Sequence, residues 1–448
     1  MIKKKPTTPR EVAVFTLFSI REEGAWSDGA LHHYIVRAGL DTRDAALASQ
    51  LACGVLQNRS LCEFYLKRFS SVRLSRLLPR VRDCLDLGIY QLVMLDRIPA
   101  HAAVSETMML IRRYAHANER TVKYANGVLR AVARAAEDGS LPVLDCPTKA
   151  EYLALRYSHP EWLTKVLCAE FGEQAAASIC AQNNESAPLC LRVDLLKTSC
   201  EKVLSELRES GLSCTMHRKI ENLILCSGGN VSAMPAFRRG DVTVQDGAGI
   251  VCVDVLAPRP GELVLDLCGA PGGKTCYIAE KMANRGHVIA GDLYEHKLER
   301  IQAAAERLGL GIIETRLADA AVFQPGLEGR ADRVLCDVPC SGMGVIRKKP
   351  EIRWKSEESL QGLPEIQYAI LETGSRYVKQ GGTLVYSTCT ILRRENAEVV
   401  EKFLKQHPEF CAEGFTHPAV GEVPEGYITL LPHIHQTDGF FIAKLRRM

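Results

Sequence analysis

Three kinds of segment are absent from the sequence. The 17 cysteines are odd in number and scattered, and no two of them form a C-x-x-C pair, which argues against a disulfide framework and a zinc ribbon. No apolar run reaches the roughly 18 residues of a membrane-spanning helix. A basic start before apolar residues 12–20 imitates a signal peptide, but Arg21-Glu22-Glu23 follows instead of a small-residue cleavage site. These absences favour a reducing cytoplasm and predict a chain with no membrane contact and no bound metal.

Charge is nearly balanced but unevenly distributed. Residues 1–134 hold 21 Lys and Arg against 12 Asp and Glu, a net +9, so the rest of the chain carries −6 of the total of +3. A basic front half favours a polyanion as its partner, although a solvated basic surface would look the same. At 448 residues and 46% hydrophobic, the chain is long enough for several domains of roughly 100–200 residues each.

The front of the chain is predicted to be all-helical. From residue 6 to 140, apolar side chains recur at every third or fourth position, and Pro99 ends one helix because proline cannot continue it. Beyond a helix that Val12 and Phe15 open, helices are expected over residues 43–57, 61–69, 82–96, 102–114 and 121–136. After a linker punctuated by prolines, one further helix is expected from Pro160 to Ala177.

The remainder of the chain alternates between strands and helices. Residues 188–240 resemble a compact RNA-recognition-motif-like (RRM-like) module, but its expected strands lack the aromatic side chains that stack on bases. From residue 263 to 444, short apolar strands alternate with helices, which predicts parallel pairing and a doubly wound sheet. We therefore predict three parts: a helical domain over 1–140, linker helices and the small module over 141–240, and the large sheet over 241–448.

The stretch from Leu263 to Thr275 (LVLDLCGAPGGKT) organises the large sheet. A short apolar strand ends at Asp266, a turn of small residues follows, and a helical pattern begins at Lys274. Such a turn brings backbone N–H groups to a small polar ligand at the carboxyl edge of a parallel sheet, and glycine leaves that approach open. The stretch fits neither the Walker loop nor G-x-G-x-x-G, so by itself it is also compatible with a purely structural turn.

Aspartates follow several predicted strands. Asp266, Asp292 and Asp337 each come at a carboxyl end, and Asp319 lies in the loop after another strand. In an open α/β sheet these ends converge on one crevice. A carboxylate after the second strand suits a ribose diol, since it can accept two hydroxyl protons, and an acid after the third can accept from an adenine amino group. Four aspartates in register with the glycine turn therefore predict a nucleoside-cofactor site.

Three segments of the helical part resemble the NusB family of RNA-binding domains. They are R-x-x-A-V-x-x-L at 10–17, I-P-A-H-A-A-V-S-E at 98–106 and K-Y-A-N-G-V-L-R at 123–130. The resemblance implies RNA binding through the basic N-terminal region, and the candidate phosphate contacts are Lys3, Lys4, Lys5 and Arg10. The alternative is a helical bundle that serves only as an interaction platform.

Two cysteine motifs follow adjacent predicted strands. The first is Asp337-Val338-Pro339-Cys340-Ser341-Gly342, and the second is Ser387-Thr388-Cys389. With the glycine stretch and Q-T-D-G-F-F at 436–441, they resemble the RNA 5-methylcytosine methyltransferases of the bacterial RsmB type, which act on 16S ribosomal RNA. This resemblance covers nearly the whole chain. It implies a monomer with an all-α NusB-like domain, a small α/β RRM-like module and a Rossmann-like class I S-adenosylmethionine methyltransferase domain.

The resemblance also assigns roles to residues. Cytosine C5 is too weak a nucleophile to take a methyl group, so a thiolate first adds at C6 and C5 then attacks the sulfonium methyl group. Cys389 is expected to be the nucleophile and Cys340 to assist product release. Asp337 is expected to bond the cytosine N3 edge and Lys274 to polarise the same region. The cofactor S-adenosyl-L-methionine is expected on Cys268, Gly269, Ala270, Pro271, Gly272, Gly273, Lys274, Asp292, Asp319 and Asp337.

A basic segment follows the first cysteine motif. Its side chains are predicted to hold RNA phosphates beside the base-binding crevice; they are Arg347, Lys348, Lys349, Arg353 and Lys355, with Trp354 among them. The target cytosine must be unpaired or flipped out, since C5 and C6 accept attack from opposite ring faces. Two alternatives stay open: Cys340 as the nucleophile, as in the DNA cytosine-5 enzymes, and an inactive methyltransferase fold in an RNA-binding assembly factor.

Overall fold

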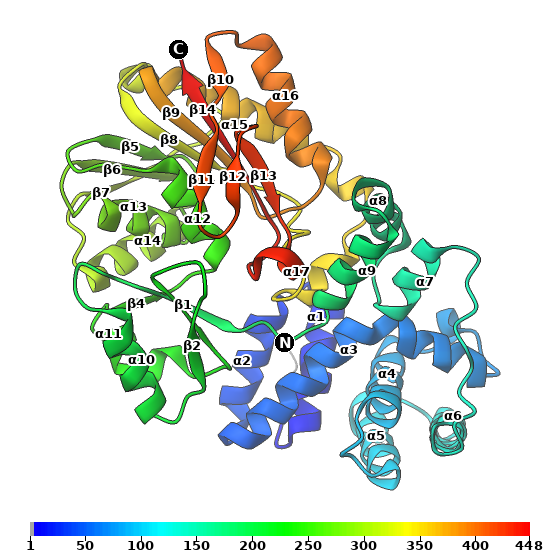
Figure 1. Ribbon diagram of the computed structural model, residues 1–448. Coiled ribbons are helices and arrows are strands. Elements are labelled where there is room, and N and C mark those ends of the chain that lie inside the picture. Colours follow the sequence, from blue (N-terminus) through cyan, green and yellow to red (C-terminus); the bar gives the residue numbers. More distant parts are fainter. Residues whose placement is uncertain (1–3) are drawn as a thin grey trace. The chain divides into compact units, whose positions relative to one another are not determined.

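The computed structural model describes residues 4–448 (Figure 1). The chain divides into two compact units. The helical unit comprises Met1–Glu185 and Ile346–Lys355, and the α/β unit comprises Ser186–Val345 and Ser356–Met448. In the sequence, residues 346–355 lie between two stretches of the α/β unit. They nevertheless pack in the helical unit. The predicted domain limits at residues 140 and 240 stay predictions, because compact packing units need not coincide with domains.

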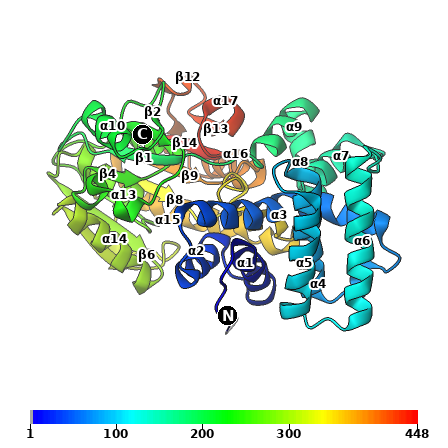
Figure 2. The same cartoon turned by 90° about the horizontal axis from the view of Figure 1, so that it is seen from below.

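Helices α1 to α6 surround one apolar core. Their ends follow sequence signals: Thr8 caps α1, Pro9 opens its first turn, and Gly24 ends it at a φ of 64°. The helices predicted over 43–57 and 61–69 are one helix, α3, with a kink at Asn58. Helices α4, α5 and α6 pack side by side (Figure 2). The bounds are α1 (Pro9–Glu23), α2 (Ser27–Ala38), α3 (Thr42–Phe69), η1 (Leu74–Arg76), α4 (Pro79–Met94), α5 (Ala100–Tyr114) and α6 (Glu119–Glu137).

The rest of the helical unit consists of α7 (Lys149–Arg156), α8 (Glu161–Phe171), α9 (Glu173–Gln182) and the 3₁₀ turn η4 (Pro350–Trp354). The prediction of one helix from Pro160 to Ala177 is wrong. Gly172 adopts a φ of 79° and separates α8 from α9, a conformation that glycine adopts without steric cost. Across residues 4–448, no helix is both long and apolar enough to span a membrane.

The small module begins the α/β unit. Its strands form an antiparallel sheet in the order β2-β3-β1-β4, and the βαββαβ sequence of elements gives it ferredoxin-like topology. This confirms the predicted RRM-like module. Cys214 and Cys226 lie opposite each other on β2 and β3 and form a disulfide, an exception to the disulfide-free chain that the sequence predicts. The bounds are β1 (Leu189–Val193), α10 (Cys200–Glu209), β2 (Cys214–Met216), β3 (Leu223–Cys226), η2 (Val231–Ala233), α11 (Pro235–Arg238) and β4 (Val242–Val244).

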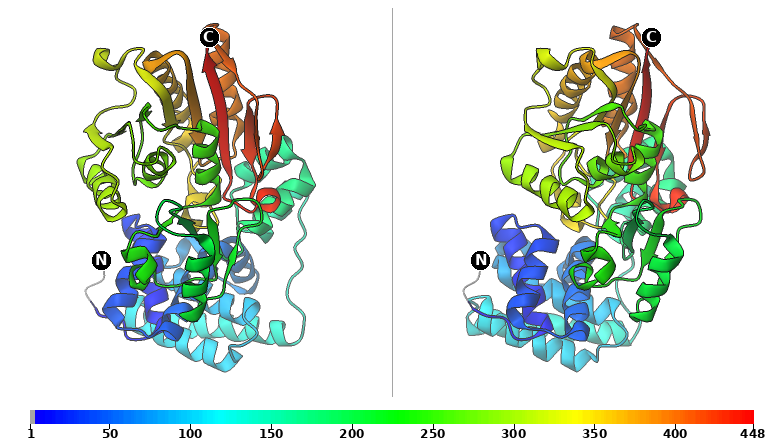
Figure 3. Two further views of the ribbon diagram at one scale, coloured as in Figure 1. Left: turned by 60° about the vertical axis from the view of Figure 1, so that its left-hand side comes forward. Right: turned by 90° about the vertical axis from the view of Figure 1, so that its left-hand side faces the viewer.

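The large sheet has the strand order β10-β14-β9-β8-β5-β6-β7, with β13 paired to β14. Strands β5 to β9 pair in parallel, and β14 lies antiparallel beside β9 (Figure 3). The doubly wound sheet is confirmed. The bounds are α12 (Gly247–Leu256), β5 (Leu263–Asp266), α13 (Gly273–Lys281), β6 (His287–Asp292), α14 (Glu295–Leu308), β7 (Ile313–Leu317), η3 (Pro325–Leu327), β8 (Ala331–Asp337), η5 (Glu358–Leu360), α15 (Leu363–Tyr377), β9 (Val378–Thr388), η6 (Arg393–Glu395), α16 (Ala397–Gln406), β10 (Phe410–Ala412), β13 (Tyr427–Leu430), α17 (Pro432–His435) and β14 (Phe440–Arg447).

Alternate residues of the central strands pack on opposite faces of the large sheet. Val264 and Val385 join an apolar cluster with α12 and α13, whereas their neighbours Leu265 and Leu384 join another with α15 and α16. Because both faces are covered, the strands are continuous apolar runs. Their polar ends are therefore the part of the sheet that remains available for chemistry.

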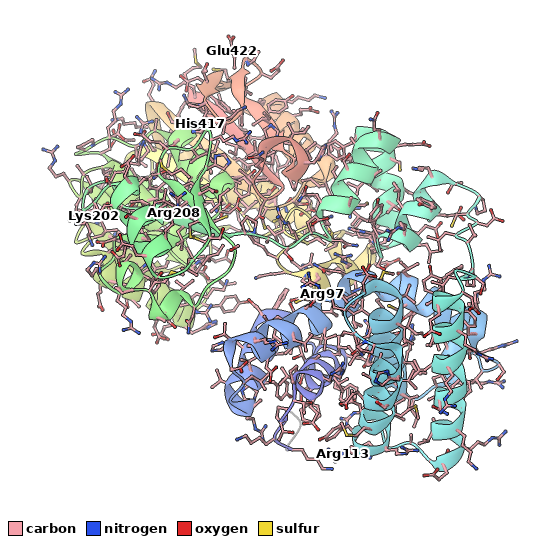
Figure 4. The ribbon with its side chains drawn as sticks, turned by 60° about the horizontal axis from the view of Figure 1, so that its bottom comes forward. Arg97, Arg113, Lys202, Arg208, His417 and Glu422 are labelled. Atoms are coloured by element: carbon pink, nitrogen blue, oxygen red, sulfur yellow. A yellow bond between two sulfur atoms is a disulfide. The ribbon has the colours of Figure 1, made fainter. Side chains whose placement is uncertain are left out.

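A separate hairpin of β11 (Phe415–His417) and β12 (Gly421–Val423) carries His417 and Glu422 (Figure 4). The hairpin is attached to α12, since His417 Nε2 lies 3.3 Å from a carboxylate oxygen of Asp254. The sequence did not predict this hairpin.

Candidate active site

The glycine turn after β5 is tightly enclosed. Gly269 N–H donates to the Gly291 carbonyl at 2.8 Å, and a Cβ on Gly269 would lie 2.8 Å from Thr275 Oγ1. Gly272 adopts a φ of 104°, and its Cβ would come within 3.2 Å of the Ile301 backbone on α14. Gly272 requires glycine because other residues rarely adopt its backbone conformation, whereas at Gly269 the constraint is the space left by Thr275. The turn therefore presents bare backbone to the cavity beside it.

A cavity of about 230 Å³ lies against this turn in the α/β unit. It brings together most of the predicted cofactor residues and three of the four predicted catalytic residues, Lys274, Asp337 and Cys389. Its lining comprises Val244, Gln245, Asp246, Ala248, Gly249, Asp266, Cys268, Gly269, Ala270, Pro271, Gly273, Lys274, Asp337, Val345, Cys389, Asp438 and Phe440. Gly272 supports the turn from behind without lining the cavity.

The aspartates at the strand ends have different surroundings. Asp266 ends β5, is almost fully buried and accepts a hydrogen bond from Thr275 Oγ1 at 2.7 Å. Burial raises the pKa of its carboxyl to about 6, against that hydrogen bond. Its Oδ1 is buried without a hydrogen-bond partner among the described residues. A bound ligand with a donor group would satisfy this oxygen.

Asp292 and Asp319 lie outside the main cavity. Asp292 ends β6 and accepts from Tyr294 N–H at 3.2 Å, with Lys297 Nζ 3.3 Å from the same oxygen. Asp319 follows β7, is exposed and accepts from Ala321 N–H at 2.9 Å. It lines a separate small hollow of about 30 Å³ with apolar side chains such as Leu267. The strand-end placement is as predicted, but only Asp266 and Asp337 line the main cavity, Asp319 lines the small hollow, and Asp292 lines neither.

Lys274 and Asp337 form an ion pair inside the cavity. Lys274 Nζ lies 2.6 Å from Asp337 Oδ2, and Ser387 Oγ donates to Asp337 Oδ1 at 2.8 Å. Burial by itself would lower the pKa of the Lys274 ammonium, but the neighbouring Asp337 carboxylate raises it overall. The ammonium also lies 5.1 Å from the centre of the Phe440 ring. Lys274 therefore stays protonated and fixes the orientation of Asp337.

Cys340 and Cys389 follow the adjacent parallel strands β8 and β9, and their Sγ atoms lie 3.2 Å apart. A hydrogen bond from Cys340 lowers the pKa of Cys389 against burial and the Asp337 charge, and the Lys274 charge lowers it further. The same hydrogen bond, together with burial, raises the pKa of Cys340 well above its usual range. Cys389 is thus the thiol that ionises first, with the protonated Cys340 as its donor.

Sequence reasoning missed several groups around this cavity. Ser387 and Asp438 lie inside motifs that were used for the resemblance, and each could have been identified there as a strand-end polar residue. Gln245 and Asp246 come from the small module and the cap of α12, and no local pattern marks them. Asp246 Oδ1 accepts from Ala248 N–H and from Asp438 N–H, both at 2.9 Å.

Arg192 on β1 supports the glycine turn from the small module and was also missed. It is 1% exposed, donates to the Gly273 carbonyl at 2.9 Å and bonds Gln245 Oε1. Its guanidinium pairs with Glu280 on α13 at 2.5 Å. A fork of N–H donors can hold several acceptors at once, so Arg192 joins β1, β4 and the start of α13.

The side chains that are predicted to contact RNA differ in their exposure and in their partners. Lys3 lies outside the described residues. Lys4 and Lys5 are exposed, with Lys4 Nζ 5.5 Å from the Tyr114 ring centre, while Arg10 donates to Gln91 Oε1 at 2.8 Å. In the later segment Arg347 and Lys348 are half-buried, and Lys349 is exposed over the Trp26 ring at 5.0 Å.

Arg353 does not contact RNA as predicted, because it is fully buried in the helical unit. Its guanidinium donates to backbone carbonyls and one side-chain amide, and burial lowers its pKa to about 9. The acceptors are the carbonyls of Pro350, Gln57, Tyr157, Ser158 and Asn183 and the Asn184 Oδ1. The sequence shows a basic run, and only the tertiary contacts reveal that one member is a structural donor.

A groove of about 930 Å³ lies between α5 and α6 in the helical unit. Met108 and Val122 contribute apolar surface to it. Its exposed cations lie at helical spacing and are Arg112, Lys123, Arg130 and Arg134, against the two acids Glu119 and Glu137. No prediction from the sequence singled out this groove.

The fold and the site together define a class of protein. A parallel sheet in the order β7-β6-β5-β8-β9, with an antiparallel strand beyond it and a glycine turn after its central strand, forms the Rossmann-like domain of class I methyltransferases. The sequence model of the 16S rRNA methyltransferase RsmB/F family matches residues 253–446. The NusB family matches residues 7–134, and an RsmF/B-like ferredoxin-like domain matches residues 159–232.

Relatives match over their whole length. A protein of Bacillus subtilis strain 168 named "Probable ribosomal RNA small subunit methyltransferase B" is 35% identical over 450 residues, with 99% of each chain covered. Ribosomal RNA small subunit methyltransferase B of Escherichia coli strain SMS-3-5 is 34% identical over 451 residues, again with 99% of each chain covered. The chain belongs to the ribosomal RNA small subunit methyltransferase B family.

Solved structures agree with this assignment. The crystal structure of PH0851 has a TM-score of 0.81 at 27% identity and covers 99% of this chain and 100% of its own. A methyltransferase homologue from Pyrococcus horikoshii has a TM-score of 0.56 at 26% identity, covering 68% of this chain and 100% of its own.

Proposed function

We propose that the protein methylates C5 of a cytosine in 16S ribosomal RNA, with S-adenosyl-L-methionine as the methyl donor. The observation that carries the proposal is the thiol pair, with Cys340 and Cys389 Sγ atoms 3.2 Å apart beside the Lys274–Asp337 ion pair. A nitrogen or oxygen acceptor needs no protein thiol, whereas the weakly nucleophilic C5 of cytosine needs covalent activation. Named relatives that act on small-subunit ribosomal RNA support the RNA substrate.

The residues around the glycine turn fit S-adenosylmethionine. Gly269, Ala270 and Gly273 line the cavity with small residues, and Asp266 Oδ1 is a buried acceptor that lacks a hydrogen-bond partner among the described residues. In the proposal Cys268–Lys274 hold the methionine end of the cofactor, Asp292 the ribose and Asp319 the adenine. When bound, S-adenosylmethionine supplies an electrophilic methyl group.

Cys389 begins the reaction in the proposed mechanism. Its thiolate adds to C6 of the cytosine, and the electron pair of the C5–C6 double bond moves toward N3. In the proposal the Lys274–Asp337 pair, with Asp337 also held by Ser387, delivers a proton to N3, which neutralises the negative charge that develops there. C5 thereby becomes a nucleophilic enamine carbon that can take the methyl group.

Cys340 completes the reaction by assisting release. While Cys389 is a thiolate, the hydrogen bond between the thiols is the largest cause of the raised pKa of Cys340. Once Cys389 is a neutral thioether on C6, that cause disappears and Cys340 ionises more readily. It can then accept the C5 proton as the C6–sulfur bond breaks, which returns the Cys389 thiolate and restores the C5–C6 double bond.

The target cytosine is proposed to be unpaired or flipped out of a helix. The thiolate must reach C6 and the methyl group must reach C5 from the two faces of the ring, and a base stacked in a helix exposes neither face. Phosphate contacts are proposed for Lys4, Lys5, Arg10, Arg347, Lys348 and Lys349, and for the cations of the α5–α6 groove. We further propose that the protein acts as a cytoplasmic monomer.

The test is a comparison of Cys340→Ala and Cys389→Ala with labelled S-adenosylmethionine and small-subunit ribosomal RNA, both naked and in precursor particles. We expect wild-type protein to transfer label to C5 of cytosine. Cys340→Ala should accumulate a covalent RNA–protein adduct, and Cys389→Ala should form none. An adduct that persists without Cys389 and vanishes without Cys340 would make Cys340 the nucleophile. Absence of transfer to either RNA form would refute the enzymatic function.

A further inference from the structure

Glu395 is a buried acid next to the two thiol loops. It ends the 3₁₀ turn η6, which follows the Cys389 loop, and its side chain is 0% exposed. Three neutral groups donate to its carboxylate. Ser341 N–H and Gln367 Nε2 donate to Oε2 at 2.8 and 2.9 Å, and Thr390 Oγ1 lies 3.4 Å from Oε1.

These donors belong to both catalytic loops. Ser341 directly follows Cys340, and Thr390 directly follows Cys389, so one carboxylate binds the residue after each thiol. The same two residues also bond each other, with 2.9 Å between Ser341 Oγ and Thr390 Oγ1. Gln367 on α15 adds a third tie, since its Nε2 also donates to the Pro339 carbonyl at 3.1 Å, just before Cys340.

The position of Glu395 is itself fixed. Tyr386 O–H donates to the Glu395 carbonyl at 2.6 Å. The next residue, Asn396, accepts from Thr388 Oγ1 at 2.6 Å and donates to the Thr390 carbonyl at 3.0 Å. The turn that carries Cys389 is therefore bonded from both sides by Glu395 and Asn396.

A buried carboxylate lowers the stability of the fold if its only role is to fill space. Removing a charge from water is unfavourable, and a glutamine or an apolar residue of the same volume would fill this space without that cost. The acceptor-only carboxylate is suited to gather several N–H and O–H donors at one point.

We propose that Glu395 is a positioning residue that holds the Cys340 and Cys389 loops together and so sets the separation of the two thiols. The proposal rests on the proposed function, in which one thiol attacks and the other assists release. Glu395 acts on the two thiols through Ser341 and Thr390, the residues that its carboxylate bonds.

The charge of Glu395 adds a second effect to the geometric one. After the hydrogen bond to Cys389, burial and the charge of Cys389 itself, the Glu395 charge is a further cause of the raised pKa of Cys340. Glu395→Gln keeps an oxygen for Ser341 and Gln367 and places an amide N–H₂ toward Thr390, but it removes the charge. Glu395→Ala removes both the bonds and the charge.

Two measurements test the proposal in the full-length chain. The first is single-turnover methylation of ribosomal RNA, with S-adenosylmethionine affinity as the check on folding. We expect Glu395→Ala to slow turnover at least ten-fold with unchanged cofactor affinity. Glu395→Gln should stay within about three-fold of wild type, with its pH profile displaced to lower pH. Glu398→Gln is the matched control, since Glu398 is 57% exposed on α16, and it should behave as wild type.

The second measurement reads thiol separation without RNA. Phenylarsine oxide binds two nearby thiols, forming two arsenic–sulfur bonds and releasing one water, and Cys340→Ser and Cys389→Ser define its background. We expect Glu395→Ala to weaken this binding at least ten-fold, and Glu395→Gln and Glu398→Gln to retain it. If Glu395→Ala fails to fold, Thr390→Val and Gln367→Met remove single donors and should each weaken binding in part.

The outcomes separate the two proposals. Wild-type binding of phenylarsine oxide by Glu395→Ala, or wild-type turnover by it, overturns the role of Glu395. If wild-type protein methylates no RNA but Glu395→Ala still loses dithiol binding, the proposed function fails and the positioning role stands. If Glu395→Gln is as defective as Glu395→Ala in both assays, the hydrogen-bonded geometry is not what Glu395 supplies and the proposal is wrong.

Discussion

At the scale of single residues, the proposed mechanism depends on which of the two neighbouring thiols ionises. Isolated buried thiols in this chain, such as Cys62 and Cys336, have pKa values raised by burial and are inert. Cys389 differs because Cys340 donates to it and the Lys274 ammonium lies in the same cavity. Burial also opposes ionisation of Cys389, but the hydrogen bond from the neighbouring thiol outweighs it and lowers the pKa.

Cys340→Ala should shift the ionisation of Cys389. The variant removes the hydrogen bond that is the largest cause of the lowered pKa of Cys389, so that pKa should rise. The alkylation rate of Cys389 by iodoacetamide follows its thiolate fraction, and its pH profile should move to higher pH, with a slower rate at neutral pH. Mass spectrometry of the Cys389 peptide measures the rate, and a profile unchanged from wild type would contradict the assignment.

At the scale of secondary-structure elements, the glycine turn is supported by elements that are distant from it in the sequence. β1 supplies Arg192, β4 leads into Gln245, and α13 supplies Glu280, and these side chains form one buried group. The small module is thus part of the wall behind the glycine turn. The module lacks the aromatic side chains that would stack on bases. Its contacts with the methyltransferase fold instead support the glycine turn.

Arg192→Met should weaken both the fold and cofactor binding. It leaves the Glu280 carboxylate buried without its partner, and loss of one member of a buried pair costs roughly 3–5 kcal/mol. The Gly273 carbonyl also loses a donor, so we expect a KM for S-adenosylmethionine raised about ten-fold. Urea unfolding and cofactor titration measure the two effects. Arg239→Met, which breaks a half-exposed pair with Glu206, should change stability by no more than about 1 kcal/mol.

The groove between α5 and α6 offers a second prediction at this scale. Lys123, Arg130 and Arg134 lie along α6 over a rise of roughly 16 Å, a length that spans several phosphates of an RNA strand. The triple alanine variant should bind ribosomal RNA more weakly and lower the slope of log affinity against log salt by about 2, since each phosphate contact contributes about 0.7–0.9.

A matched triple variant tests whether RNA affinity depends on the cations of the groove or only on the total charge of the helical unit. Arg43, Arg73 and Arg76 are exposed on other parts of the helical unit, and their replacement by alanine should lower the slope far less. Equal effects of the two triple variants would show that the groove has no special role. Fluorescence anisotropy with labelled RNA at several salt concentrations provides the measurement.

At the scale of the whole molecule, the chain order and the packing order differ. Residues 346–355 follow the Cys340 loop in sequence but pack in the helical unit. There Glu351 accepts from Ser27 N–H at 3.0 Å and from Ser27 Oγ at 2.7 Å at the start of α2. Arg353 bonds the Gln57 carbonyl beside the kink of α3 and the carbonyls that follow α7 and α9. The helical unit is therefore completed by a segment that the sequence places inside the methyltransferase domain.

Arg353→Met should destabilise the helical unit. The variant leaves several buried carbonyls without donors, and each unsatisfied group costs about 1–3 kcal/mol, so we expect a loss of roughly 3 kcal/mol or more. Hydrogen exchange should speed up most at the ends of α7, α8 and α9. Lys349→Met, at an exposed position over Trp26, should cost no more than about 1 kcal/mol. Unchanged exchange in Arg353→Met would contradict a structural role for Arg353.

Local patterns in the sequence determined the elements and their type. Helical periodicity, proline stops and apolar runs identified the helical front and the parallel sheet, because these signals act over a few residues. The motifs identified the glycine turn, the strand-end aspartates and both thiols. Each of these groups lies within a few residues of the end of one strand, so a local pattern is enough to find it. The sequence predicted two helices where α3 is one helix with a kink at Asn58, and it predicted one helix across Gly172, because helical periodicity continues past that glycine.

Only the tertiary structure decided which of these groups meet. It brought Cys340 to within 3.2 Å of Cys389, placed Arg192 behind the glycine turn and buried Arg353 among carbonyls. A sequence shows the charge of a side chain but not its burial, and burial with specific partners decides whether an arginine binds RNA or stabilises the fold. The same holds for Glu395, which the sequence shows as one acid among many and the structure shows bound to both thiol loops.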